Sequence, residues 1–176
     1  MKTTSWSVCG TLSVLVLVSQ VWANSPRSRK AVHPPAPARY QYTAPDGSYR
    51  VIYPTGWYVT ARSNAMIIKS GGDIGDRGVF GIVLREEGVS NRDAVKKEFK
   101  SPNKPQDLVK TNSTIAGLPA IKVVGSGKDD PNNKMVEYYV SHPSGREYYI
   151  MMLAPQNQWP RFAARFNTML QSLSFQ

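Results

Sequence analysis

Two aspartates in a glycine-rich loop are the residues best suited to metal chemistry in this sequence. Asp73 and Asp76 lie between Ser70 and Gly78, and carboxylates are ligands that a hard cation such as calcium prefers. One hypothesis is therefore a small metal-dependent enzyme or a calcium-binding accessory factor that uses this loop. The loop has only two acids, lacks the EF-hand spacing and carries Arg77. A solvated loop is the preferred interpretation, and we expect no metal and no cofactor.

The other reactive residue types do not form a recognisable catalytic pattern. A zinc site built on the two histidines, His33 and His142, would require distant parts of the chain to meet. No Gly-x-Ser-x-Gly motif presents a nucleophile, and residues 125–128 (GSGK) lack the spacer and the final Ser or Thr of a phosphate-binding loop. Asp129 and Asp130, which two asparagines follow closely, are interpreted as a turn. The residues alone therefore assemble no recognisable catalytic or metal-binding arrangement.

The first residues have the pattern of a secretory signal peptide that spans residues 1–23. Lys2 precedes an apolar run over residues 8–18, and small residues lead to a cleavage site after Ala23. We expect an exported protein, periplasmic or secreted, without a transmembrane segment after cleavage; an uncleaved membrane anchor is the alternative. The single cysteine, Cys9, lies in this segment, so we expect no disulfide in the exported chain.

Residues 24–39 are rich in proline and basic residues and contain almost nothing apolar to bury. This composition predicts a disordered basic leader. Residues 40–176 are long enough to form one domain with its own core.

The net charge of the sequence is strongly positive. Its 22 Lys and Arg against 12 Asp and Glu give a formal charge of +10, which favours an acidic protein or an anionic envelope component as the partner. Ordinary solubilising charge is the alternative, and the absence of nucleic-acid-binding motifs argues against nucleic acid. The predicted contact residues are the basic residues of the leader and of one helix: Arg27, Arg29, Lys30, Arg39, Lys96, Lys97 and Lys100.

Hydrophobic periodicity predicts many short strands and two helices. A cap at Ser90 begins one helix, which ends before Pro102, and apolar residues at steps of three and four mark a second helix near the C-terminus. Hairpin-type turns and the lack of alternating βαβ units favour an α+β fold, a largely antiparallel β-sheet flanked by helices. The expected strands are 40–42, 49–53, 57–61, 66–68, 79–84, 109–115, 120–125, 134–141 and 147–154, and the expected helices are 91–100 and 159–173.

A corner between two of these strands is the most specific structural signal. The strand that ends at Tyr53 is followed by Pro54 and Gly56, and the alternation restarts at Trp57. Proline cannot donate to a sheet and glycine can adopt positive φ, so the chain should turn there and deliver Trp57 to the core.

Two pairs of adjacent tyrosines should face each other across a hairpin, Tyr138 and Tyr139 with Tyr148 and Tyr149. Neighbours in a strand point to opposite faces. One tyrosine of each pair is therefore expected in the core, and the other is a candidate for an aromatic surface that contacts a partner.

Three phrases, taken in their order and spacing, resemble the PsbP-like family. They are GSYRVIYPTGW at 47–57, AGLPA at 116–120 and MLQSLSF at 169–175. This superfamily includes the PsbP photosystem subunits, a Ran-binding nuclear import factor and many exported bacterial proteins. The resemblance implies an α/β/α sandwich and a non-catalytic accessory role. A plain secretory signal and a basic leader distinguish this chain from the photosystem members, which argues against a photosynthetic role.

The leading hypothesis is thus a non-catalytic, exported PsbP-like domain that recognises a protein or an anionic envelope component. The metal-dependent alternative depends on the loop of Asp73 and Asp76.

Overall fold

The strands and helices follow the sequence-based expectation closely. The computed structural model describes residues 39–71, 78–84, 88 and 90–176, which belong to one unit, Ala36–Gln176. Residues 1–38 and the loop with Asp73 and Asp76 lie outside the described residues. The elements are β1 (Arg39–Thr43), β2 (Tyr49–Pro54), β3 (Trp57–Ala61), β4 (Ala65–Ser70), β5 (Val79–Leu84), α1 (Asn91–Lys100), β6 (Val109–Ile115), β7 (Leu118–Ser126), β8 (Asn133–Ser141), β9 (Glu147–Pro155), the 3-10 helix η2 (Gln156–Gln158), α2 (Trp159–Gln171) and β10 (Ser174–Phe175).

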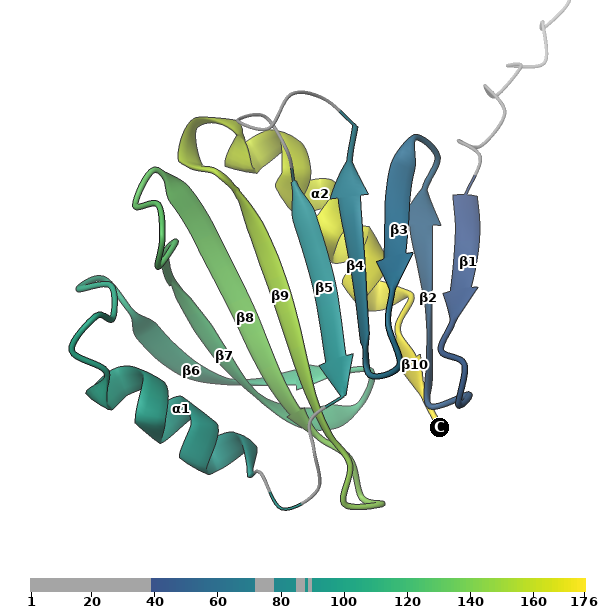
Figure 1. The fold of residues 1–176 in the computed structure, drawn as a ribbon, viewed down its shortest axis with the longest axis horizontal. Coiled ribbons are helices and arrows are strands. Elements are labelled where there is room, and N and C mark those ends of the chain that lie inside the picture. The colour runs from purple at the N-terminus through teal and green to yellow at the C-terminus, as the bar shows by residue number, and fades with distance from the viewer. Residues whose placement is uncertain (1–38, 72–77, 85–87, 89) are drawn as a thin grey trace, which may run out of the picture. The chain divides into compact units, whose positions relative to one another are not determined.

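The described strands form two antiparallel sheets. The larger sheet has seven strands in the order β3-β4-β5-β9-β8-β7-β6, and the smaller has three in the order β1-β2-β10. In the larger sheet β9 pairs with β5 and β8 pairs with β7. The hairpin of β8 and β9 therefore lies between strands β3 to β5, which precede α1 in the chain, and strands β6 and β7, which follow it. Figure 1 shows α1 and α2 on opposite sides of this sheet. The expected α+β sandwich is confirmed.

The corner at residues 54–57 carries the chain from the smaller sheet to the larger one. β2 ends at Pro54, Gly56 has a φ of 79°, and β3 begins at Trp57. The side chain of Trp57 is only 7% exposed. Its ring lies 6.0 Å, centroid to centroid, from each of the Phe162 and Phe166 rings of α2. The corner thus joins the two sheets and places Trp57 against α2.

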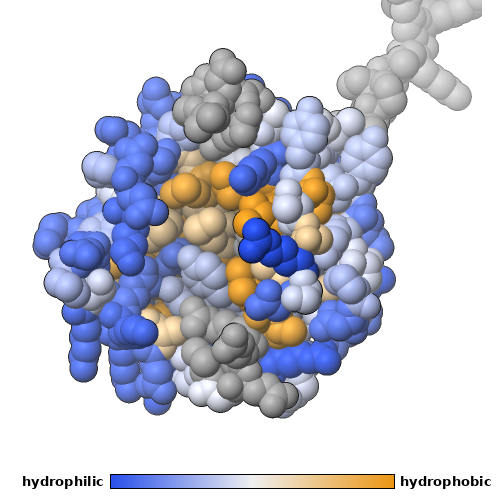
Figure 2. All heavy atoms as spheres, in the orientation of Figure 1, coloured by the Kyte–Doolittle hydropathy of each residue, from blue (hydrophilic) through white to orange (hydrophobic). Residues whose placement is uncertain are grey.

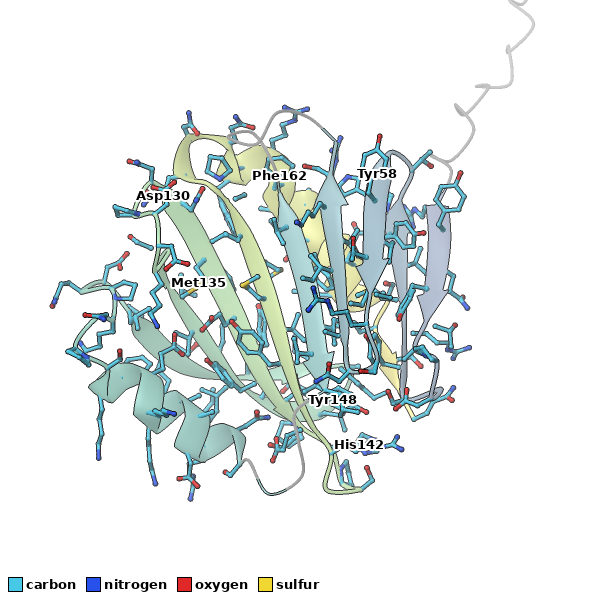
Figure 3. All side chains as sticks on the ribbon, in the orientation of Figure 1. Tyr58, Asp130, Met135, His142, Tyr148 and Phe162 are labelled. Carbon is cyan, nitrogen blue, oxygen red and sulfur yellow. The ribbon has the colours of Figure 1, made fainter. Side chains whose placement is uncertain are left out.

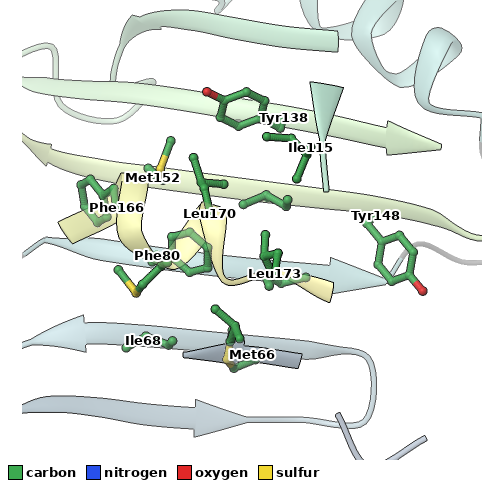
Figure 4. Packing of buried hydrophobic residues seen from close by; sticks show 14 of the residues in the cluster. Met66, Ile68, Phe80, Ile115, Tyr138, Tyr148, Met152, Phe166, Leu170 and Leu173 are labelled. Atoms are coloured by element: carbon green, nitrogen blue, oxygen red, sulfur yellow. The ribbon is translucent and has the colours of Figure 1, made fainter. Parts of the chain in front are cut away.

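The main core lies between the larger sheet and α2. Alternate residues of the strands, among them Ile68, Phe80 and Met152, pack toward Phe166 and Leu170 of the helix (Figure 4). Burying a large apolar side chain contributes about 1.5–3 kcal/mol, so this layer provides most of the stability of the domain.

A second, smaller core lies on the other face of the sheet beneath α1. Val95 of the helix packs with Val123 of β7 and Tyr139 of β8, and Phe99 contacts this cluster from the helix. Adjacent tyrosines divide between the two cores, with Tyr138 in the α2 core and Tyr139 in the α1 core. Strand alternation therefore supplies apolar side chains to both faces.

Two features at the ends of the domain differ from the sequence-based expectation. β1 begins at Arg39, which was assigned to the leader. Ser174 and Phe175, which follow the helix expected over residues 159–173, form β10 and pair with β2. The Phe175 ring lies 4.6 Å from the Tyr148 ring, centroid to centroid. Two residues are too few for a periodic signal, and their pairing partner lies far away in the sequence.

Candidate functional site

Polar contacts hold α1 against the end of the β8–β9 hairpin. Asn91, at the start of the helix, is buried, and its Nδ2 donates to the carbonyl oxygen of Val140 at 2.9 Å and to Oε2 of Glu147. The Ser90 hydroxyl accepts a hydrogen bond from the backbone N–H of Arg92 and caps the first turn. The helix is therefore fixed at one end, and its other end overhangs β8 and β9.

A cavity of about 570 Å³ opens beneath this overhang. This volume lies in the range of small-molecule sites. Its walls come from α1, from the loop that follows it, from Lys128 after β7, and from β8 and β9. The residues that line it are Asp93, Ala94, Lys97, Glu98, Ser101, Lys104, Pro105, Lys128, Glu137, Tyr139 and Tyr149.

Two carboxylates and two phenols form a continuous array along the floor of the cavity. The Tyr139 hydroxyl donates to Oε2 of Glu98 at 2.5 Å and lies 3.2 Å from Oε2 of Glu137. The Tyr149 hydroxyl donates to Oε1 of Glu137, and the rings of the two tyrosines are 5.3 Å apart between centroids. A phenol has one proton and cannot donate fully to two carboxylates. A proton on Glu137 makes both contacts of Tyr139 favourable.

The environment of Glu137 favours the protonated form of its carboxyl group. Glu137 is only 3% exposed, and burial, with a further contribution from the negative charge of Glu98, raises its pKa to about 7 although hydrogen bonds from both tyrosines oppose the change. Burial and the neighbouring carboxylates also raise the pKa of Tyr139, so it stays protonated. Among the described residues, no basic side chain lies within 4.0 Å of Glu98 or Glu137. As far as the structure describes the floor, its two carboxyl groups have no cationic partner.

The rim of the cavity carries the opposite charge. Lys97 and Lys128 are exposed, and Lys104 is half-buried. The loop with Lys104 is held by Asp107, which accepts hydrogen bonds from the backbone N–H of Ser126 at 3.1 Å and from its hydroxyl at 2.8 Å. These bonds lower the pKa of Asp107. Negative charge in the floor is thus separated from positive charge at the mouth.

The lysines predicted as contact residues lie together on α1. Lys96, Lys97 and Lys100 are all exposed and line a shallow depression on the outer side of the helix. Lys96 forms an ion pair with Asp93 at 3.4 Å. Of the predicted leader residues, Arg39 lies at the start of β1 and lines a separate depression. Arg27, Arg29 and Lys30 lie outside the described residues.

Next to α1 the larger sheet presents an apolar face. Figure 2 shows apolar side chains gathered near the centre of this face, with hydrophilic side chains both among them and around them. By strand alternation the apolar residues point away from α2, and they belong to neither of the two core clusters. They are the partly exposed Ile67, Val79, Val83, Met151 and Leu153 together with the buried Met135.

The remaining chemical candidates are not brought together. Asp130 lies in the β7–β8 turn, where its carboxylate accepts from the backbone N–H of Asn132 and from Nδ2 of Asn133. His142 lies in the β8–β9 turn at the other end of β8 (Figure 3), with Nδ1 2.7 Å from the Ser144 hydroxyl. Within the part of the chain that the structure describes, no three His, Cys, Asp or Glu residues form a group suited to a metal ion.

The prediction that one tyrosine of each pair could form an exposed aromatic surface is wrong for the pair Tyr138 and Tyr139, because both are buried. Tyr139 is only 4% exposed and Tyr149 is half-buried, because α1 covers them. Sequence reasoning also missed Glu98 and Glu137. The available signal was a single acidic residue in the apolar strand 134–141, two positions before Tyr139 and therefore on the same face.

None of the helices described here has both the length and the apolar composition needed to span a bilayer.

The sequence matches no protein-family model and no curated protein. Solved structures nevertheless resemble this chain. Cyanobacterial PsbP (CyanoP) from Synechocystis sp. PCC 6803 superposes with a TM-score of 0.55 and 10% identity, over 80% of this chain and 94% of that protein. The Ran-binding protein Mog1p of Saccharomyces cerevisiae superposes with a TM-score of 0.51 and 11% identity, over 80% of this chain and 96% of that protein.

Two further structures extend this similarity. LpqN, involved in cell envelope biogenesis of Mycobacterium tuberculosis, gives a TM-score of 0.54 and 11% identity over 78% of this chain and 90% of that protein. A protein of Bacteroides thetaiotaomicron gives 0.55 and 11% identity over 77% of this chain, which spans 48% of that protein. At these identities the similarity concerns the fold. The chain has the PsbP-like fold that the resemblance of its sequence implied.

Proposed function

We propose that this chain is a non-catalytic accessory domain that binds an acidic partner protein through the face that carries α1. The observation that supports this most directly is the apolar sheet face beside a helix with three exposed lysines. An apolar centre with a polar, charged rim is the usual anatomy of a protein interface. The proposed contacts are Lys96, Lys97 and Lys100 at the rim and Met151 and Leu153 at the centre.

The structural neighbours support a binding role in general terms. Mog1p is a Ran-binding protein and LpqN is involved in cell envelope biogenesis. The basic balance of the sequence favours an acidic partner. An anionic envelope polymer is the second candidate, because the same lysines would attract it.

The proposal includes export. The signal peptide predicted over residues 1–23 would direct the chain to the periplasm or the medium, and the basic leader 24–39 would tether the domain or add to the charge contacts through Arg27, Arg29 and Lys30. N-terminal sequencing of the protein from its host tests this. Retention of residues 1–23 would exclude a cleaved signal.

Capture from an envelope extract tests the partner surface. We compare the full exported chain with a Lys96→Gln/Lys100→Gln variant and with a matched Arg161→Gln/Arg165→Gln variant, which removes two exposed charges from α2. Proteins captured at low salt should be lost with the α1 variant, retained with the α2 variant and released as salt rises. Equal capture by both variants would contradict the proposal.

Substitution of the apolar centre separates a protein partner from a charged polymer. Met151→Gln should weaken capture of a protein, because apolar contacts at the centre of an interface contribute most of its affinity. A polymer bound only by the lysines would be retained.

The metal-dependent alternative uses Asp73 and Asp76, which lie outside the described residues. Calorimetric titration with calcium and zinc decides it, and submillimolar binding that is lost in Asp73→Asn/Asp76→Asn would favour it over the binding module.

A further inference from the structure

We propose that the cavity beneath α1 binds a small zwitterionic group, with a primary ammonium on Glu98 and Glu137 and an anionic group on the rim lysines Lys104 and Lys128. This site adjoins the protein-binding surface proposed above and shares Lys97 with it. Its test uses other residues, so either proposal can fail alone.

Among the residues that the structure describes, no basic side chain pairs with the two carboxyl groups in the floor of the cavity. Glu137 is almost completely buried, with only 3% of its surface exposed. Within the described residues neither Glu137 nor Glu98 has a basic partner within 4.0 Å. Burial of a carboxylate without an opposite charge is costly. A primary ammonium offers three N–H donors, enough to serve both carboxylates where the single proton of Tyr139 cannot.

The aromatic walls suit the same group. Tyr139 and Tyr149 both line the cavity, with ring centroids 5.3 Å apart. A cation close to such rings is attracted by their π faces, by about 0.5–2 kcal/mol. Of the described residues, two contribute carboxyl groups to the floor, whereas calcium takes six to eight oxygen ligands. The described floor is better matched to an organic ammonium than to calcium.

The rim selects against a plain cation. Lys97, Lys104 and Lys128 surround the mouth, and Asp93, the remaining acid of the lining, is engaged by Lys96. Like charges at the entrance repel an isolated amine, whereas an anionic group next to the ammonium would pair with the lysines. A ligand with both charges satisfies floor and rim together.

Protonation of Glu137 provides a specific signature of binding. Among the described residues, the groups that face it are Glu98 from α1, Tyr139 on its own strand and Tyr149 from β9, and none of these three supplies a positive charge. At pH 6 Glu137 is mostly protonated, because burial raises its pKa to about 7. An ammonium bound beside it favours the carboxylate, so binding should release a proton.

Isothermal titration calorimetry with three probes tests the assignment. O-phosphoethanolamine has both charges, ethanolamine only the ammonium and inorganic phosphate only the anion. We expect O-phosphoethanolamine to bind at least about tenfold more tightly than either of the others, a difference of about 1.4 kcal/mol. At pH 6 its apparent enthalpy should vary with the ionisation enthalpy of the buffer, which reports the released proton.

Variants assign each pole of the ligand. Glu137→Gln should weaken O-phosphoethanolamine about tenfold or more and reduce proton release to the part that comes from the phosphate group itself. Lys104→Gln/Lys128→Gln should weaken O-phosphoethanolamine but leave ethanolamine bound as tightly or more tightly, because less positive charge repels it at the entrance. The matched control is Lys122→Gln/Lys134→Gln. These two lysines lie over the rings of Tyr138 and Trp159 and do not line the cavity, so the control should bind as the parent does. Thermal unfolding of each variant confirms that it is folded.

Vesicles distinguish a soluble ligand from a lipid head group. Phosphatidylcholine vesicles doped with phosphatidylethanolamine present a primary ammonium beside a phosphate, and vesicles doped with phosphatidylglycerol present only the anion. Selective, Glu137-dependent binding to the first would support a lipid source, whereas soluble binding without vesicle binding would support a free metabolite. Equal binding of phosphate and O-phosphoethanolamine, unchanged in Glu137→Gln, would overturn the proposal, as would failure of all three probes to bind.

Discussion

Replacing Glu137 with glutamine should change how the stability of the domain depends on pH. Unfolding exposes this carboxyl group and returns its pKa from about 7 to the ordinary value of 4.5. Between these values the folded protein keeps a proton that the unfolded chain has released, so the free energy of unfolding must fall as the pH rises through this window. One pKa unit corresponds to about 1.4 kcal/mol. The interval therefore predicts a loss on the order of 3 kcal/mol between pH 4 and pH 8.

Glutamine keeps the shape of the side chain and cannot ionise. Its amide can accept from the Tyr149 hydroxyl and donate to that of Tyr139, so the array in the floor remains satisfied. Relative to the parent, Glu137→Gln should gain stability progressively from pH 4 to pH 8. Urea denaturation followed by tryptophan fluorescence at a series of pH values measures this difference.

A matched control separates the buried group from general charge effects. Asp129→Asn removes an exposed carboxylate in the β7–β8 turn, and its stability should run parallel to that of the parent across the pH range. If the curves of Glu137→Gln and the parent are also parallel, Glu137 is not buried in the way described and the reasoning fails.

Three further substitutions test the packing. Trp57→Ala should lower the free energy of unfolding by about 3 kcal/mol or more, because the ring is buried against α2; an unchanged denaturation midpoint would show that it is exposed. Gly78→Ala should destabilise by about 1–3 kcal/mol, since the new Cβ would lie 2.5 Å from Cδ1 of Phe162, and Phe162→Leu in the same chain should recover part of the loss in a double-mutant cycle. Ala116→Gly should stabilise by about 1 kcal/mol, because Ala116 has a φ of 50° in the β6–β7 turn; a lower melting temperature would contradict that turn geometry.

Most of the fold was predictable because its signals are local. The Pro54 to Trp57 corner, the cap at Ser90 and the spacing of aromatic residues in α2 depend on residues close together in the sequence, and each fixes an element without knowledge of its neighbours. The division of β2 and β3 between two sheets was not predictable. The corner specifies a change of direction, whereas the partner of each strand is decided by residues far along the chain.

The candidate site was only partly predictable for the same reason. The exposed lysines of α1 follow from helical periodicity. The cavity requires Glu98, Glu137 and Tyr149 to meet. They lie on α1, β8 and β9, and they meet only because α1 packs against these two strands. In the sequence Glu137 is one acid among apolar neighbours, and the helix that buries it precedes it by two strands.

The pairing of β10 with β2 also constrains when the chain can fold. The Ser172 hydroxyl accepts from the backbone N–H of Ile52, 120 positions earlier, and the backbone N–H of Gln176 donates to the carbonyl oxygen of Ser48. These contacts cannot form until the segment that carries β10 has been synthesised. Because β10 follows every other described strand in the chain, the hairpin of β1 and β2 waits for its third strand while the whole larger sheet is made. Such distant pairings make folding slow, on the order of milliseconds to seconds.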